Sequence, residues 1–95
     1  MTRFVVFVIE KPKPKIVGLL KHHVLAITSS VYAGSLPRNV IEAIWSQIER
    51  ATESAALILQ AKNELGILVR IHGERRHHII DQYGIPLVAI TREDL

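Results

Sequence analysis

The sequence predicts an α+β domain of the ferredoxin-like type, an antiparallel sheet with two helices on one face, assembled as a two-fold homodimer. Strand and helix patterns follow the order β-α-β-α-β-β, with a further short strand near the end. Each helix pattern has one apolar stripe, so both helices need a sheet to pack against. Helices on one face leave the other face open, and with 48% apolar residues a second copy of the chain is its simplest cover.

The first half of the chain contains a strand, a helix and a second strand. The run Arg3–Ile9 is continuously β-branched and aromatic, which is typical of a central strand covered on both faces. From Lys15 to Ile27, apolar residues recur at helical spacing, so we expect a helix there. Thr28 to Ala33 is expected to form a short strand that ends at Gly34.

A stronger helix pattern follows. Ser35 is a good N-cap and Pro37 is tolerated in a first helical turn, so the helix should begin here and reach about Thr52. Its apolar stripe consists of Ile41, Ile44, Trp45 and Ile48.

The last third of the chain predicts strands. Residues 55–62 and 67–72 are expected to form a hairpin, because Asn63–Gly66 between them is rich in turn residues. A polar, turn-rich segment follows at 73–84. Ile85–Ile90 is expected to be a short edge strand, since it contains a proline.

The composition indicates one small domain, residues 1–95, with an uneven positive charge. The net charge is +3, and up to Arg38 the chain carries six Lys or Arg residues and a single acid. This asymmetry favours a polyanionic partner, although lysines that only keep a protein soluble give the same count. The absence of cysteine excludes disulfides and thiolate metal sites and fits a reducing compartment. With no membrane-spanning run and no signal peptide pattern, we expect a cytoplasmic protein with no membrane partner.

Two basic clusters are the candidate nucleic-acid-binding residues. Lys11, Lys13 and Lys15 alternate with prolines after the first strand, in a segment expected to be extended and polyproline-like. Arg75 and Arg76 are adjacent in the late polar segment, and guanidinium groups suit phosphate oxygens. The alternatives are a solvated lysine turn and surface ion pairs of the arginines with neighbouring acids.

Glu10, directly after the first strand, is the candidate metal ligand. Magnesium sites combine carboxylates with substrate phosphates and water, so one glutamate does not hold a catalytic magnesium alone. In a two-fold dimer, two copies of Glu10 could face one another and share a metal. Otherwise Glu10 is a counter-charge for Lys11 or Lys13.

Together these segments resemble a known family, the CRISPR-associated Cas-two proteins of the type I-E subtype. The resemblance covers nearly the whole chain, and the order and spacing of the segments carry it more than any one motif. The segments are Phe4 to Glu10, the basic proline turn, Val31-Tyr32-Ala33-Gly34, Ile44-Trp45 with Gln47-Ile48, and Arg75-Arg76 before a last strand.

The resemblance implies a ferredoxin-like homodimer that bridges two dimers of the Cas-one integrase. This assembly holds a short duplex of foreign DNA, the protospacer, for insertion into a CRISPR array in antiviral defence. The C-terminal segment 85–95 would dock the integrase. The implied contacts to the duplex backbone come from Lys11, Lys15, Arg75 and Arg76, with Arg38 at the start of the second helix.

The resemblance also implies a second activity. The family is described as a magnesium-dependent endonuclease on RNA or DNA, with an acidic residue, usually Asp, where this chain has Glu10. Three functions therefore stay open. They are a non-catalytic DNA-binding adaptor, a metal-dependent endoribonuclease or double-strand DNase that uses Glu10, and a ferredoxin-like regulatory or metabolite-binding domain.

Overall fold

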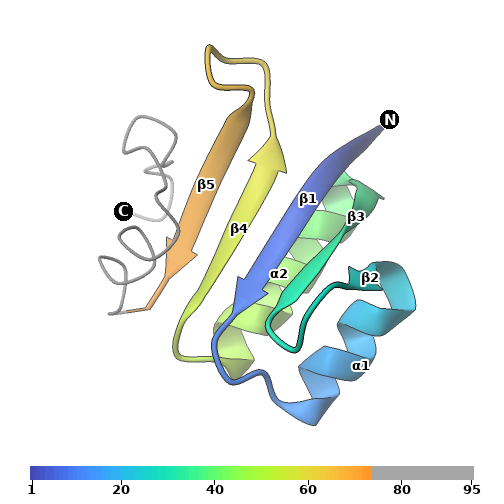
Figure 1. Cartoon of the computed structure of the whole chain (residues 1–95), viewed down its shortest axis with the longest axis vertical. Coiled ribbons are helices and arrows are strands. Elements are labelled where there is room, and N and C mark those ends of the chain that lie inside the picture. Colours follow the sequence, from blue (N-terminus) through green and yellow to red (C-terminus); the bar gives the residue numbers. More distant parts are fainter. Residues whose placement is uncertain (74–95) are drawn as a thin grey trace.

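The computed structural model describes residues 1–73, which form one antiparallel sheet of five strands with two helices (Figure 1). The elements in chain order are β1 (Thr2–Ile9), α1 (Pro14–His23), β2 (Leu25–Ala26), β3 (Val31–Pro37), α2 (Arg38–Ala51), β4 (Ala55–Gln60) and β5 (Ile67–His72). The run β1-α1-β2-β3-α2-β4 is the ferredoxin-like element order, and its strands lie in the spatial order β2-β3-β1-β4. β5 joins the edge of β4 through a hairpin. The predicted fold class is confirmed.

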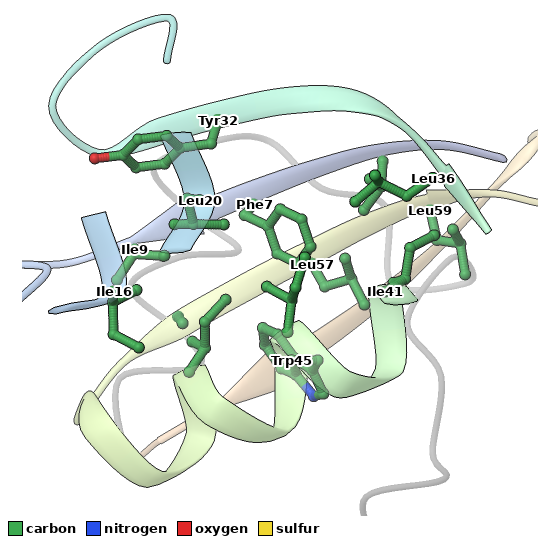
Figure 2. Close-up of a cluster of buried hydrophobic side chains, with 14 residues drawn as sticks. Phe7, Ile9, Ile16, Leu20, Tyr32, Leu36, Ile41, Trp45, Leu57 and Leu59 are labelled. Carbon is green, nitrogen blue, oxygen red and sulfur yellow. The ribbon is translucent and has the colours of Figure 1, made fainter. Parts of the chain in front are cut away.

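β1 is the central strand, paired antiparallel with β3 on one side and with β4 on the other. Its alternate side chains Val5, Phe7 and Ile9 are buried in a single core with residues of both helices (Figure 2). α1 adds Ile16 and Leu20 to this core. α2 adds the whole predicted stripe, Ile41, Ile44, Trp45 and Ile48. The first strand, the α2 stripe and the β4–β5 hairpin are therefore confirmed.

The first helix is shorter than predicted. α1 ends at His23, and Val24 is already extended with φ −138° and ψ 171°. Residues 25–26 then pair with β3 as the edge strand β2, so their backbone groups bond across the sheet instead of along a helix. Val24 packs against the core, whereas Ile27, the last residue of the predicted stripe, is 57% exposed.

The second strand begins and ends later than predicted. Residues 28–30 form a bend, and β3 then runs through Gly34 to Pro37, because seven residue pairs join it to β1. Ser35 therefore lies in the sheet and does not cap α2. The helix begins at Arg38 after Pro37, with no side-chain cap.

The face of the sheet opposite the helices is also apolar. Its buried cluster consists of Val8, Ala56, Val69 and Ile71, with Val6, Val31, Ile58 and Ile67 packed against it. Phe4 follows the alternation of β1 onto this face and is 51% exposed. Leu25 lies opposite Ala33 in the register, on the same face, and is 71% exposed. Within residues 1–73, both helices pack on the other side of the sheet.

Several predicted features lie outside the described residues. They are the polar segment from residue 74 onward, the strand at Ile85–Ile90 and the C-terminal docking segment 85–95. In the described part of the chain, neither helix has the length and apolar character needed to cross a bilayer.

Two glycines give a matched test of the packing. Gly18 is exposed on α1, and a Cβ added to it would meet no atom within 4 Å, whereas a Cβ on Gly34 would lie 2.9 Å from Cγ1 of Val24. We expect Gly18→Ala to stabilise the fold by roughly 0.5–1 kcal/mol, since alanine favours a helix. Gly34→Ala should destabilise it by roughly 1–3 kcal/mol, because the site is overpacked. Urea unfolding followed by circular dichroism measures both, and a stable Gly34→Ala variant would show that Val24 moves aside freely.

Candidate nucleic-acid interface

One end of the sheet gathers the segments that carry most of the candidate residues. In the register across the sheet, Ile9 lies opposite Ala55, and Ala55 lies opposite His72. β1 therefore ends, β4 begins and β5 ends along one row, and α2 ends nearby (Figure 1). The segment after β1, residues 10–15, starts from this row and contains three lysines. It is the lysine turn.

The sequence predicted one extended segment for the lysine turn, and this prediction is wrong. Lys11 has a φ of 52°, a left-handed conformation that residues other than glycine rarely adopt. Lys13 is extended but serves as the N-cap of α1, and Pro14 begins the helix, a position that suits its fixed φ. Lys15 already lies in the first helical turn. All three lysine side chains are exposed, so the expectation of outward-facing charges holds although the backbone differs.

Backbone hydrogen bonds fix both ends of the lysine turn. The Glu10 N–H donates to the carbonyl oxygen of Ser54 at 3.1 Å, which ties the end of β1 to the loop between α2 and β4. The Lys13 carbonyl accepts the N–H groups of Ile16 and Val17 at 2.9 and 3.0 Å. α1 has no side-chain cap and no acid in its first turn. Its N-terminal N–H groups and the positive end of its dipole therefore add to the lysine charges and favour an anion here.

A hollow of about 330 Å³ lies between the lysine turn and the end of α2. Its lining includes Glu10, Lys11 and Lys13 from the turn and residues 51–54 from the other side. Because Glu10 and Glu53 bring two carboxylates beside two lysines, the charges of the hollow balance. A phosphate in the hollow would meet both carboxylates, so the exposed outer side of the turn is the better surface for a DNA backbone.

Glu10 stands directly after β1, where the resemblance placed an acidic residue, and its side chain is half-buried. Among residues 1–73, no three Asp, Glu or His side chains come close enough together to hold a metal ion. Magnesium draws on several oxygen ligands. The described residues of one copy therefore do not fit a magnesium ion by themselves, and a second copy or a substrate phosphate would have to complete a site at Glu10.

Arg38 lies at the opposite end of the sheet from the lysine turn. It is the first residue of α2, and Pro37 before it pairs with Thr2 at the start of β1. β1 has eight residues, so roughly 25 Å of strand separates the two positions. The charge of Arg38 also acts on Glu42, one turn further along α2. Within one copy, the structure does not bring Arg38 together with the lysines.

Arg75 and Arg76 lie outside the described residues. The structure does describe Gly73, which comes two residues before Arg75 in the sequence. Gly73 follows β5 at the same end of the sheet as the lysine turn, and its backbone is packed against Glu53, a residue that also lines the hollow.

An ion pair between β5 and α2 was missed by sequence reasoning. Arg70, which is 9% exposed, donates two hydrogen bonds to the carboxylate of Glu42, at 2.8 and 2.5 Å. These bonds hold the pKa of the Glu42 carboxyl below its ordinary value; burial opposes the shift, and the charges of Arg70 and Arg38 add to it. The sequence did carry one signal of this pair, an arginine within an otherwise apolar strand. Its partner could not be identified from the sequence, because Glu42 lies 28 residues away in the chain.

The fold and the lysine turn define a ferredoxin-like protein with a basic surface at one end of its sheet. A family model described as CRISPR-associated protein (Cas_Cas2CT1978) matches residues 4–87. The match spans most of the chain, which therefore belongs to this CRISPR-associated Cas2 (Cas-two) family. No curated protein matches the sequence.

The Arg70–Glu42 pair predicts how stability depends on pH. Because the folded state lowers the pKa of Glu42, the unfolded chain takes up a proton first as the pH falls below the ordinary value of 4.5. The stabilisation by this pair is therefore present above pH 4.5 and is lost as the pH falls through the lower, folded-state pKa.

We expect Glu42→Gln to be less stable than the wild type at pH 7, and the difference to narrow as the pH falls below 4.5, because the unfolded wild-type chain then takes up a proton. Urea unfolding at a series of pH values measures this. Glu64→Gln, on the exposed β4–β5 hairpin, is the matched control and should follow the wild type throughout. A constant difference between Glu42→Gln and wild type from pH 7 to 3 would contradict the assignment.

Proposed function

We propose that this Cas2-family protein is the DNA-binding adaptor of a type I-E spacer-acquisition complex. As a homodimer it bridges two Cas-one integrase dimers and holds a protospacer duplex through contacts to the phosphate backbone. The observation that carries the proposal is the lysine turn, three exposed lysines around an uncapped helix N-terminus at one end of the sheet. Family membership supports the CRISPR-associated role, and the resemblance supplies the subtype and the integrase partner.

The charge of this half of the chain supports a nucleic-acid partner. Between Glu10 and Glu42 the sequence has no acidic residue, and five Lys or Arg side chains fall in this interval. Lysine is a point charge on a flexible stem, which binds phosphates without a fixed geometry. Phosphate contacts carry no sequence information. Such contacts suit an adaptor that accepts foreign DNA of any sequence.

The homodimer is proposed on the apolar face of the sheet opposite the helices. β1, β3, β4 and β5 all contribute apolar side chains to this face, and Phe4 and Leu25 are exposed on it. Covering the face with a second copy removes apolar area from water, at roughly 25 cal/mol per Å². A two-fold axis lets the same patch serve both copies. The lysine turn then occurs twice, and the fixed distance between the two turns sets the length of duplex that the adaptor holds.

The other two functions have less support. An endonuclease depends on Glu10, and in the hollow beside it Glu53 is accompanied by Lys11 and Lys13, whose charges oppose a bound cation. The chain belongs to a CRISPR-associated family, and no observation favours a regulatory or metabolite-binding domain.

The dimer proposal predicts that a charge on the exposed apolar face separates the copies. Leu25 is 71% exposed, so Leu25→Asp should fold normally but leave a charge to be buried in the dimer. We expect the wild type to have the mass of a dimer in size-exclusion chromatography with light scattering, and Leu25→Asp to have the mass of a monomer at low micromolar concentration. Leu65→Asp, at another exposed leucine on the hairpin, is the control and should stay dimeric. A dimeric Leu25→Asp variant would place the interface elsewhere.

The adaptor proposal predicts a specific change in the salt dependence of DNA binding. A labelled duplex of spacer length is titrated with the protein and its integrase partner over a salt series in magnesium, and fluorescence anisotropy gives the affinity. Each lost phosphate contact lowers the slope of log K against log salt by about 0.9. The triple variant Lys11→Ala/Lys13→Ala/Lys15→Ala should therefore lose up to about three units of slope, equally for duplexes of different sequence. Lys62→Ala, on the hairpin at the opposite end of the sheet, should change nothing.

The same samples distinguish the adaptor from the nuclease when the DNA is run on a gel afterwards. We expect uncut DNA and an unchanged slope for Glu10→Ala. An unchanged slope in the triple variant would remove the lysine turn from the interface, and cleavage that disappears in Glu10→Ala would favour the endonuclease.

A further inference from the structure

A second hollow, of about 460 Å³, also touches the lysine turn and lies between α1 and the bend at residues 28–30. α1 packs beside β2 at this edge of the sheet (Figure 1). Pro12 of the lysine turn lines the hollow together with Val17 and Lys21 of α1. The remaining lining comes from β2, the bend and the start of β3. The hollow therefore adjoins the surface that we propose for DNA binding.

The charge of this hollow differs from that of the hollow beside Glu10. There, two carboxylates accompany two lysines, and the charges balance. Here, the lining that the structure describes has the positive charge of Lys21 and no carboxylate. Thr28 and Ser29 add two hydroxyl groups to it. Lysine and hydroxyl side chains are common partners of DNA phosphates, so of these two hollows this one suits an anion.

Thr28 presents a hydroxyl group whose hydrogen-bonding role is fixed by the bend. Its Oγ1 accepts the backbone N–H groups of Ser30 and Val31 at 3.1 and 3.0 Å. A threonine hydroxyl has two acceptor lone pairs and one hydrogen, so these bonds leave its O–H to donate. The Tyr32 hydroxyl donates to the Ser29 carbonyl at 3.1 Å and braces the same bend. The donor is therefore held in place before a ligand binds, which lowers the entropic cost of binding.

Apolar side chains complete the lining and suit the sugar that lies between two phosphates. Val17 is half-buried on α1, and Ile27 is 57% exposed after β2. Carbon atoms of a deoxyribose would cover these side chains and remove apolar area from water. A lysine and a hydroxyl beside apolar groups thus match the alternation of phosphate and sugar along a nucleic-acid strand.

We infer that this hollow binds one phosphate of the duplex backbone through Lys21 and the Thr28 hydroxyl. The DNA strand that crosses the lysine turn continues past Pro12 into the hollow, where its sugar packs on Val17 and Ile27. The inference rests on the proposed function and extends it, because it adds to the lysine turn a phosphate site with a fixed hydrogen-bond donor.

The first test is the salt dependence of duplex binding, measured with the full chain and its integrase partner. Lys21→Ala should lose about 0.9 unit of slope for each copy of the chain whose hollow is occupied, because one phosphate contact is lost. Lys21→Arg keeps the charge and should keep the wild-type slope. Lys62→Ala, on the hairpin at the opposite end of the sheet, is the matched control and should also keep it.

The second test separates the Thr28 donor from the fold of the bend. Thr28→Asn and Thr28→Asp both keep a side-chain oxygen that can accept the N–H groups of the bend, but only asparagine also offers a donor. We expect Thr28→Asn to bind the duplex like the wild type and Thr28→Asp to bind about tenfold more weakly, because its carboxylate repels the phosphate. Leu65→Asp adds the same charge on the hairpin and should bind like the wild type. All variants are assayed below their thermal unfolding midpoints.

The outcomes separate this inference from the proposed function. If the triple lysine-turn variant loses slope but Lys21→Ala does not, the hollow binds no phosphate, while the proposed function stands. Equal affinities of Thr28→Asn and Thr28→Asp would also overturn the inference. So would a Lys21→Ala variant that keeps the slope but binds the integrase more weakly without DNA, since the hollow would then bind protein. If the triple variant and Lys21→Ala both keep the wild-type slope, the proposed function fails together with the inference.

Discussion

The pairing of β1 on both of its edges is the constraint on which the rest of the structure depends. Seven residue pairs join it to β3 and five to β4, so the strand is held in one register on both sides. Its side chains alternate between two apolar faces, of which one receives both helices. The row at which β1 ends also determines where the lysine turn starts and which residues of β4 and β5 lie beside it.

Features with a strong local pattern were predictable from the sequence. The α2 stripe, with Ile41 and Trp45 among its members, has a helical period that does not depend on the rest of the fold, and it is buried as expected. β2 could not be predicted in this way. A strand of two residues exists only because β3 lies beside it, and apolar residues at Val24 and Ile27 continue the helical spacing past the true end of α1. The prediction that Ser35 caps α2 was also wrong because of strand pairing, since the pairing of β3 with β1 extends to Pro37.

The candidate site was predictable as a set of residues but not as an arrangement. The three lysines were identified from their spacing, and they are exposed together. Arg38 was grouped with them through the family resemblance, and only the strand register shows that the length of β1 separates them. The sequence carried no signal of the contacts that His72 and Gly73 make, because their neighbours Thr52 and Glu53 come close only when β5 is aligned on β4.

The shortness of β2 has a consequence for how copies of the chain meet at high concentration. β2 lies at one edge of the sheet and presents only two residues of backbone there. Exposed sheet edges are templates on which further strands add and fibres grow, and long, flat edges are the most prone to do so. An edge of two residues offers too short a ladder for this. Open-ended growth of filaments from β2 is thereby disfavoured.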